Sequence, residues 1–185
     1  LCLRLPTETA IECWQLKVEN LQENERDISV YPYFPVGYRS WMNQSGYFDH
    51  ALNAIVCRSI EPYQKVADYF KNQSLHELTF LACDRPADGW ETRQHVFEGE
   101  GGLHAPSGVT DSALGNGQAN YCTPTAVMQH KLKLQATQST LLHFIFGPAK
   151  DQQHIAALKQ QFLLKPEQVF AQLGQDYQAY LHAGK

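Results

Sequence analysis

Apolar and polar residues alternate in short runs along most of the chain, and this pattern predicts β-strands up to about residue 147. In the segment 11–18, Trp14, Leu16 and Val18 fall on one face of a strand, while Lys17 falls on the other. The other predicted strands cover residues 28–34, 51–60, 78–83, 126–135 and 141–146. The last of these is almost continuously apolar, which is typical of a strand buried on both faces between packed layers.

The pattern changes after Gly147-Pro148, a pair of residues that is expected to end the β-structure. Apolar residues then recur at helical spacing in 151–164, behind Asp151 as a candidate N-cap, and again in 166–182. A further short helix is predicted at 62–72. The chain is therefore expected to contain a β-sandwich domain in residues 1–147 and a helical linker in residues 148–185.

Composition limits the class of protein. The 185 residues suffice for one domain, and the net charge of −4 argues against a nucleic acid or an anionic membrane as partner. No apolar run approaches the roughly 18–20 residues of a membrane span. The five cysteines are scattered, odd in number and never spaced as Cys-x-x-Cys, and three of them lie in apolar runs. Buried thiols in a reducing compartment, most simply the cytoplasm, are expected.

The segment 84–104 is the most unusual part of the sequence. It directly follows the predicted strand 78–83 and combines four glycines with charged side chains, among them Arg85, Arg93, Glu98 and Glu100. Such polar groups need water or a ligand, so a loop rather than a core element is expected here. Residues 97–121 hold six glycines and are expected to be loop as well. Two interpretations of the segment 84–104 remain open, a solvated connection between strands and a sugar-binding surface. A second aromatic, polar and glycine-rich segment at 37–49 favours the sugar-binding surface.

An ordered series of motifs resembles a known family. It consists of the strand 11–20, Tyr38-Arg39-Ser40-Trp41, Thr79-Phe80-Leu81-Ala82, Trp90-Glu91-Thr92 with Phe97-Glu98-Gly99, and the strand Phe144-Ile145-Phe146-Gly147. This series is similar to the N-terminal β-sandwich domain of the cellobiose phosphorylase family, glycoside hydrolase family 94, and most similar to its cellobionic acid phosphorylase branch. The resemblance covers nearly the whole chain. It implies a mainly β fold, an antiparallel β-sandwich (super-sandwich, galactose-mutarotase-like) followed by two C-terminal linker helices.

The resemblance also implies an enzyme, a disaccharide phosphorylase that acts as a glycosyltransferase. In this family a carboxylic acid of an (α/α)-barrel domain protonates the glycosidic oxygen while inorganic phosphate attacks the anomeric carbon. That barrel has no counterpart here, so no catalytic residue is expected in this segment, which looks like an excised piece of a longer enzyme. The expected partners are a carbohydrate substrate, the missing barrel and a second copy in a homodimer. Phosphate would be a co-substrate, and neither a cofactor nor a metal is expected.

The family's equivalent of the loop 93–102 reaches the active site of the partner subunit. The resemblance therefore implies acceptor-side binding in trans by Gln94, Arg93, Glu98 and Glu100. Gln94 stands where cellobiose-specific members tend to carry arginine, and a neutral amide there suits an open-chain aldonic acid. Trp41 and Tyr47 are candidates for stacking on a sugar, although aromatic residues of sandwich domains more often belong to the core.

Other chemistry is less well supported. Glu98 and Glu100, two residues apart on a loop, are not held across a sugar ring as a hydrolytic carboxylate pair would be. His95 and His104 lack the short spacing of zinc ligands. His130 and His143 lie in predicted strands, where a hydrogen-bonded structural role is expected. The alternative to a phosphorylase domain is a stand-alone carbohydrate-binding β-sandwich.

Overall fold

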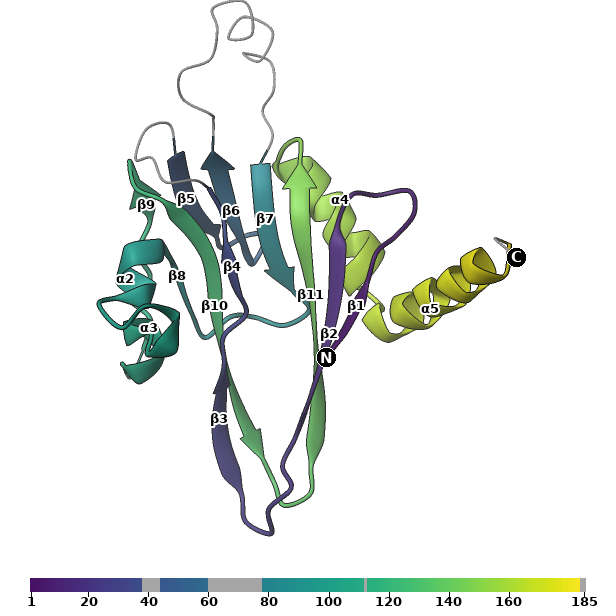
Figure 1. Cartoon of the computed structure of the whole chain (residues 1–185), viewed down its shortest axis with the longest axis horizontal. Coiled ribbons are helices and arrows are strands. Elements are labelled where there is room, and N and C mark those ends of the chain that lie inside the picture. Colours follow the sequence, from purple (N-terminus) through teal and green to yellow (C-terminus); the bar gives the residue numbers. More distant parts are fainter. Residues whose placement is uncertain (38–43, 60–77, 112, 184–185) are drawn as a thin grey trace, which may run out of the picture.

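The computed structural model describes residues 1–37, 44–59, 78–111 and 113–183, and it shows two antiparallel sheets with helices at the C-terminal end (Figure 1). The larger, seven-stranded sheet has the order β1-β2-β11-β7-β6-β5-β9. Its strands are β1 (Cys2–Arg4), β2 (Glu12–Glu19), β5 (Gln44–Asp49), β6 (Ala54–Ser59), β7 (Leu78–Cys83), β9 (Ala119–Asn120) and β11 (Ser139–Ala149). This architecture confirms the predicted mainly β, antiparallel fold.

The smaller, four-stranded sheet is built around the long strand β10 (Pro124–Leu134). Two short strands, β3 (Arg26–Val30) and β4 (Tyr33–Pro35), pair with successive parts of β10, and β8 (Gly89–Arg93) also pairs with it. The strand predicted at 28–34 is therefore present but divided around Pro32, which has no N–H to donate to a ladder.

The two sheets face each other across an apolar core. Side chains from both sheets form one buried cluster, which includes Phe48, Leu81, Trp90, Met128 and Phe144. A second cluster lies on the outer face of the larger sheet, under the C-terminal helices, and includes Val56, Phe80, Ile145, Ile155 and Phe162. Strand β11 contributes to both clusters, as the continuous apolar run predicted.

Strand β11 also passes through Gly147-Pro148, where the sequence predicted its end. Pro148 and Ala149 still pair with Thr79 and Leu78 of β7. The pairing of β11 with β2 ends at Phe146, so Pro148 lies where β11 has a single neighbour. Proline is tolerated at such an edge position, and for this reason the pair does not break the strand.

The prediction of a continuous loop in 84–104 is wrong. Gly89–Arg93 is strand β8, and Trp90, Glu91 and Thr92 are buried. The polar side chains find partners inside the protein instead of water: Thr92 Oγ1 donates to a carbonyl oxygen of Gly46 or Gly117, each at 2.9 Å, and accepts from Ala119 N. The loop predicted at 97–121 likewise contains short helical turns and β9; the turns are η1 (Gly102–His104) and α3 (Ser107–Thr110).

The two C-terminal helices are found where the apolar spacing predicts them, as α4 (Gln152–Leu163) and α5 (Pro166–Ala183). Asp151 caps α4 by accepting a hydrogen bond from His154 N at 2.7 Å. None of the described helices is long and apolar enough to cross a membrane. The helix predicted at 62–72 lies outside the described residues.

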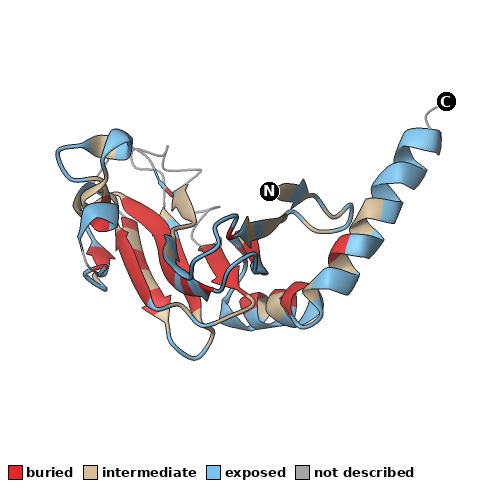
Figure 2. Cartoon of the chain, turned by 90° about the horizontal axis from the view of Figure 1, so that it is seen from below, coloured by how far each residue is buried: buried red, intermediate tan, exposed pale blue. Residues whose placement is uncertain are grey.

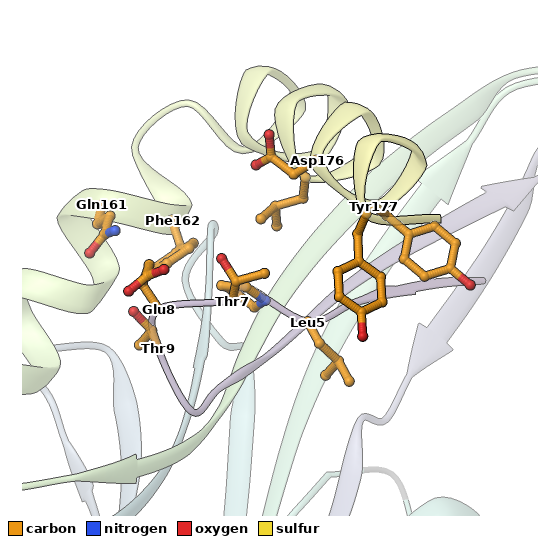
Figure 3. Close-up of a pocket in the computed structure, with 11 residues that line it drawn as sticks. Leu5, Thr7, Glu8, Thr9, Gln161, Phe162, Asp176 and Tyr177 are labelled. Carbon is orange, nitrogen blue, oxygen red and sulfur yellow. The ribbon is translucent and has the colours of Figure 1, made fainter. Parts of the chain in front are cut away.

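Helix α5 covers the sandwich only with its first half. Phe170 is buried in the outer cluster, whereas Tyr177 and Tyr180 are exposed. The C-terminal half of the helix extends away from the sheets and is mostly exposed (Figure 2). A pocket of about 370 Å³ lies between the segment 5–9 and the part of α5 that runs from Leu173 to Tyr180. Tyr177 points toward Leu5 across this pocket (Figure 3). The apolar stripe of α5 is therefore divided between core and surface.

The five cysteines are free thiols. Cys13, Cys57 and Cys83 are buried, as their apolar surroundings in the sequence predicted. Burial raises the pKa of the Cys13 and Cys57 thiols to about 12, which suits structural and unreactive side chains.

Both strand histidines are buried. His143 is hydrogen-bonded as expected: its Nδ1 lies 2.7 Å from Asp84 Oδ2, and its Nε2 lies 3.0 Å from Gln15 Nε2. For His130 neither ring nitrogen has a partner of good hydrogen-bond geometry among the described residues, although the backbone carbonyl of Pro86 lies near enough to favour the protonated ring. Burial lowers the pKa of His130, and its ring packs beside Phe144 at 5.6 Å.

Candidate functional site

The candidate site lies where strand β8 ends and the short helix α2 (Gln94–Glu98) begins. This helix and α3 lie together at the side of the four-stranded sheet (Figure 1). Arg93 is the N-cap residue in extended conformation, and Gln94 N donates to Thr123 O at 3.2 Å. A helix of five residues is too short to be stable alone, so its position depends on what holds it to the sheet.

A buried ion pair fixes the end of β8. Glu91, whose side chain is 1% exposed, binds Arg93 through both carboxylate oxygens: Oε1 lies 2.9 Å from Nε, and Oε2 lies 2.9 Å from Nη2. Glu91 Oε1 also accepts from the backbone N–H groups of Thr92 and Arg93 at 3.0 Å. The hydrogen bonds that the Arg93 guanidinium donates to Glu91 raise the pKa of Arg93. This bidentate geometry is the strong form of an arginine–carboxylate interaction.

The guanidinium of Arg93 fits against glycine. A Cβ atom at Gly117 would lie 1.9 Å from Arg93 Nη2, and one at Gly115 would lie 3.4 Å from it. Any side chain at Gly117 would displace the guanidinium. The glycines of the predicted loop 97–121 thus include one that leaves space for the ion pair.

A second network connects α2 to the four-stranded sheet. Glu98 Oε1 accepts two hydrogen bonds, one from Tyr33 O–H at 2.5 Å and one from Gln94 Nε2 at 2.8 Å. Gln94 and Glu98 are four residues apart, and one turn of helix brings such residues together. Tyr33 belongs to β4, on the sheet itself. Burial and the hydrogen bond to Glu98 raise the pKa of Tyr33 to about 12, so the phenol remains protonated at neutral pH.

An aromatic cluster lies under this network. Phe97 of α2 is buried and stacks on Tyr33 with ring centroids 5.2 Å apart, and Tyr31 lies 6.4 Å from the same ring. Gly108 of α3 allows this packing, because a Cβ atom there would lie 2.3 Å from Phe97. The cluster anchors the middle of α2.

The structure gives the other predicted binding residues different surroundings. Glu100 and His95 are exposed, and no described side chain bonds to either of them. Tyr47 of β5 packs with the outer cluster, and its hydroxyl accepts from Gln152 Nε2 of α4 at 2.9 Å. Sugar stacking at Tyr47 would therefore occur on the face of the larger sheet that is opposite to β8. Trp41 lies outside the described residues.

Arg85, the other arginine of the segment 84–104, is part of a separate cluster. Its Nη2 donates to Leu141 O at 2.6 Å, and its neighbour Asp84 binds His143. These residues line a second, polar pocket together with Lys165 and Glu167 beside α5. No group of side chains that could hold a metal ion occurs in the described part of the chain.

Tyr33 is the residue of this site that the sequence did not indicate. It is 65 positions away from Glu98, and nothing in its local sequence distinguishes it from a core tyrosine. The four-residue spacing of Gln94 and Glu98 could have indicated their hydrogen bond, because residues four apart are neighbours on a helix. The segment was expected to be a loop, where this spacing has no such meaning.

Comparison with known proteins defines the class of domain. Residues 3–164 match the family described as "Glycosyl hydrolase 94, supersandwich domain", and the chain belongs to this family. It is also 47% identical over 181 residues to a protein of Neurospora crassa named "Cellobionic acid phosphorylase". The match covers 98% of this chain and 23% of that protein, so the chain spans about a quarter of the relative's length.

Proposed function

We propose that this chain is the non-catalytic sandwich domain of an inverting disaccharide phosphorylase that cleaves cellobionic acid or cellobiose with phosphate. The products would be glucose 1-phosphate and the acceptor sugar or sugar acid. The relative named above carries the first of these substrates in its name, and the chain shares nearly half of its residues with it over the matched region. The catalytic acid would reside in a barrel domain outside this chain, and inorganic phosphate would be the co-substrate.

The domain would shape the acceptor site. The observation that carries this proposal is the fixed position of Gln94, a half-buried amide held at the surface by Glu98, itself bonded to a sheet residue. Glu98, the exposed part of Arg93 and Glu100 would surround the amide. We propose that this surface acts in trans, in the active site of a second copy of the enzyme, so that activity requires a homodimer.

The helical end would connect the sandwich to the catalytic barrel. Exposed apolar residues gather there, with Leu5, Tyr177, Tyr180 and Leu181 all at least 44% exposed. Tyrosine and leucine side chains gathered in this way are typical of surfaces that another domain covers. The linker would begin after β11, and the free thiols suit a cytoplasmic enzyme.

The acceptor role is tested by Gln94→Ala in the full-length enzyme. Loss of one neutral hydrogen bond costs about 0.5–1.5 kcal/mol, more if a buried partner is left unpaired. The acceptor KM is therefore expected to rise about 3- to 30-fold, with the constants for glucose 1-phosphate and phosphate nearly unchanged. Kinetics with gluconate, glucose and glucuronate as acceptors measure this. His95→Ala, the exposed neighbour on α2, is the matched control. If the acceptor KM of Gln94→Ala equals that of the parent enzyme, the segment 93–102 does not bind the acceptor and is only a solvated connection.

The proposed location of the catalytic acid in a separate barrel domain leads to a second prediction. The purified 185-residue chain should release no sugar 1-phosphate from cellobionic acid or cellobiose, because the catalytic acid lies elsewhere. Phosphorolysis assays with the full-length enzyme as positive control measure this. Release by the isolated chain would contradict the proposal. Binding of either sugar by the isolated chain, without turnover, would instead support a stand-alone carbohydrate-binding module.

A further inference from the structure

The inner face of strand β10 carries a histidine in a series of apolar residues. Alternate residues of a strand share one face, and those of β10 that belong to the buried inter-sheet cluster are Ala126, Met128, Leu132 and Leu134. His130 occupies the remaining position of this series and is 1% exposed. Neither ring nitrogen has a hydrogen-bond partner of good geometry among the described residues. A neutral ring therefore fits this position better than a charged one, because an unpaired charge costs more to bury than a neutral polar group.

The connection between the two sheets passes beside this histidine. Residues 84–88 lead from β7 of the larger sheet to β8 of the smaller sheet (Figure 1). Asp88 ties the end of this connection to both chain neighbours of His130. Its N–H donates to Gln129 O at 2.8 Å, and its Oδ2 accepts from Lys131 N at 2.7 Å.

The surroundings of the His130 ring are uncharged on the side of the strands. Phe144 of β11 packs beside the ring with centroids 5.6 Å apart, and Val30 of β3 is its partner in the sheet. The backbone carbonyl of Pro86 also lies near the ring. The charged groups that act on the ring belong to the connection, and they are Asp84, Arg85 and Asp88. Burial outweighs the two carboxylates and lowers the pKa of His130, so the ring is neutral at neutral pH.

We propose that His130 is an acid-sensitive latch between the two sheets. The neutral ring packs as part of the inter-sheet core, beside the connection that Asp88 ties to β10. A protonated ring must reach water or move toward the Pro86 carbonyl and the carboxylates of the connection, and either movement disturbs the attachment of residues 84–88. Strand β8 follows this connection directly, so the β8 side of the smaller sheet loosens first.

The sign of the pH dependence follows from the lowered pKa of His130. In an opened or unfolded chain the histidine has an ordinary pKa of about 6.5, so the opened chain binds a proton more readily than the closed protein. The stability that the neutral ring provides is fully present above this value and is lost as the pH falls below it. For one such site, the equilibrium constant for opening rises by up to about 10-fold between pH 7.5 and 5.5.

Chemical denaturation of the 185-residue chain at pH 7.5 and 5.5 tests the latch. His130→Leu and His130→Met replace the ring with uncharged side chains of similar size, and contributions from other titratable groups, such as His143, cancel in the comparison. On acidification the unfolding equilibrium constant of the parent should rise about 3- to 10-fold more than that of either variant. His95→Ala, at an exposed position on α2, is the matched control and should keep the pH dependence of the parent. Equal responses of the parent and both His130 variants would overturn the proposal.

The ring itself can be followed by NMR in the parent, which needs no variant. The imidazole signals of His130 should show no protonation until the pH is well below about 6.5, the ordinary value for histidine. Titration of His130 at or above that pH would contradict the latch.

Amide hydrogen exchange locates the opening. The protection factors of the Asp88 and Lys131 amides, which form the two ties, should fall at least about 3-fold between pH 7.5 and 5.5 in the parent and stay constant in His130→Leu. The amides between β2 and β11 should change less. An equal loss of protection throughout both sheets would overturn a latch at this position.

Asp88→Asn separates the histidine from its carboxylate neighbour. The amide oxygen of asparagine can still accept from Lys131 N, and the charge that favours a protonated ring is removed, so the acid response should persist. Loss of the response in Asp88→Asn would assign it to titration of Asp88 and would overturn the role of His130.

Discussion

Arg93→Met is expected to lower the free energy of unfolding of this chain by about 2–4 kcal/mol. The variant removes the cation that binds both oxygens of Glu91 and leaves a carboxylate that is 1% exposed. Removing one partner of a fully buried pair costs about 3–5 kcal/mol. The Arg93 side chain is 32% exposed, so solvent screening reduces this value. Chemical denaturation of the 185-residue chain at neutral pH measures the difference.

Two controls separate the buried charge from the loss of the side chain. Arg93→Met combined with Glu91→Gln should recover at least half of the lost stability, because it removes the unpaired charge and keeps the shape. Lys17→Met breaks an ion pair with Glu19 whose side chains are 56% and 45% exposed, and it should change stability by less than about 0.5 kcal/mol. If Arg93→Met costs no more than Lys17→Met, the Glu91–Arg93 pair does not hold the end of β8.

This ion pair also shows why the sequence did not predict β8. The segment Glu91-Thr92-Arg93 is polar, and polar groups usually indicate contact with water. Glu91 and Arg93 pair with each other, but this pair depends on Gly117, which leaves the space for Arg93. The partners of Thr92 also come from distant parts of the chain, since Gly46 and Gly117 supply its carbonyl oxygens. Satisfaction of polar groups by residues so far apart cannot be recognised from composition.

The elements that were predicted correctly depend on nearby residues or on burial alone. Alternation was sufficient for β2, continuous apolar character for β11, and a capping Asp151 with helical spacing for α4. The candidate site was predicted in part. Gln94 and Glu98 were named from the family resemblance, but their joint hydrogen bond and its link to Tyr33 depend on sheet pairing between β4 and β10. Register between strands that are far apart in sequence is set by the folded core.

In the C-terminal helix α5, one stripe of apolar residues is buried in its first half and exposed in its second half. Its first half closes the outer cluster, in which Phe170 is 7% exposed and lies 5.4 Å from the ring of His143. Its second half presents Tyr177 and Tyr180 to solvent. Helical spacing predicted the helix over 166–182 but not the point at which its apolar side chains leave the core, since the sequence does not show where the sheet beneath it ends.

Phe170→Ala is therefore expected to destabilise the 185-residue chain by about 3 kcal/mol, the lower end of the range for a phenylalanine removed from a core. Tyr180→Ala, on the same helix but 72% exposed, should change the free energy of unfolding by less than about 0.5 kcal/mol. Both values come from denaturation of the same 185-residue chain. Similar losses for the two variants would mean that α5 is held along its whole length, and no loss for Phe170→Ala would mean that the helix is not docked. In the full-length enzyme, where we propose that the barrel covers Tyr180, only the Tyr180→Ala loss should increase, because that side chain then becomes buried.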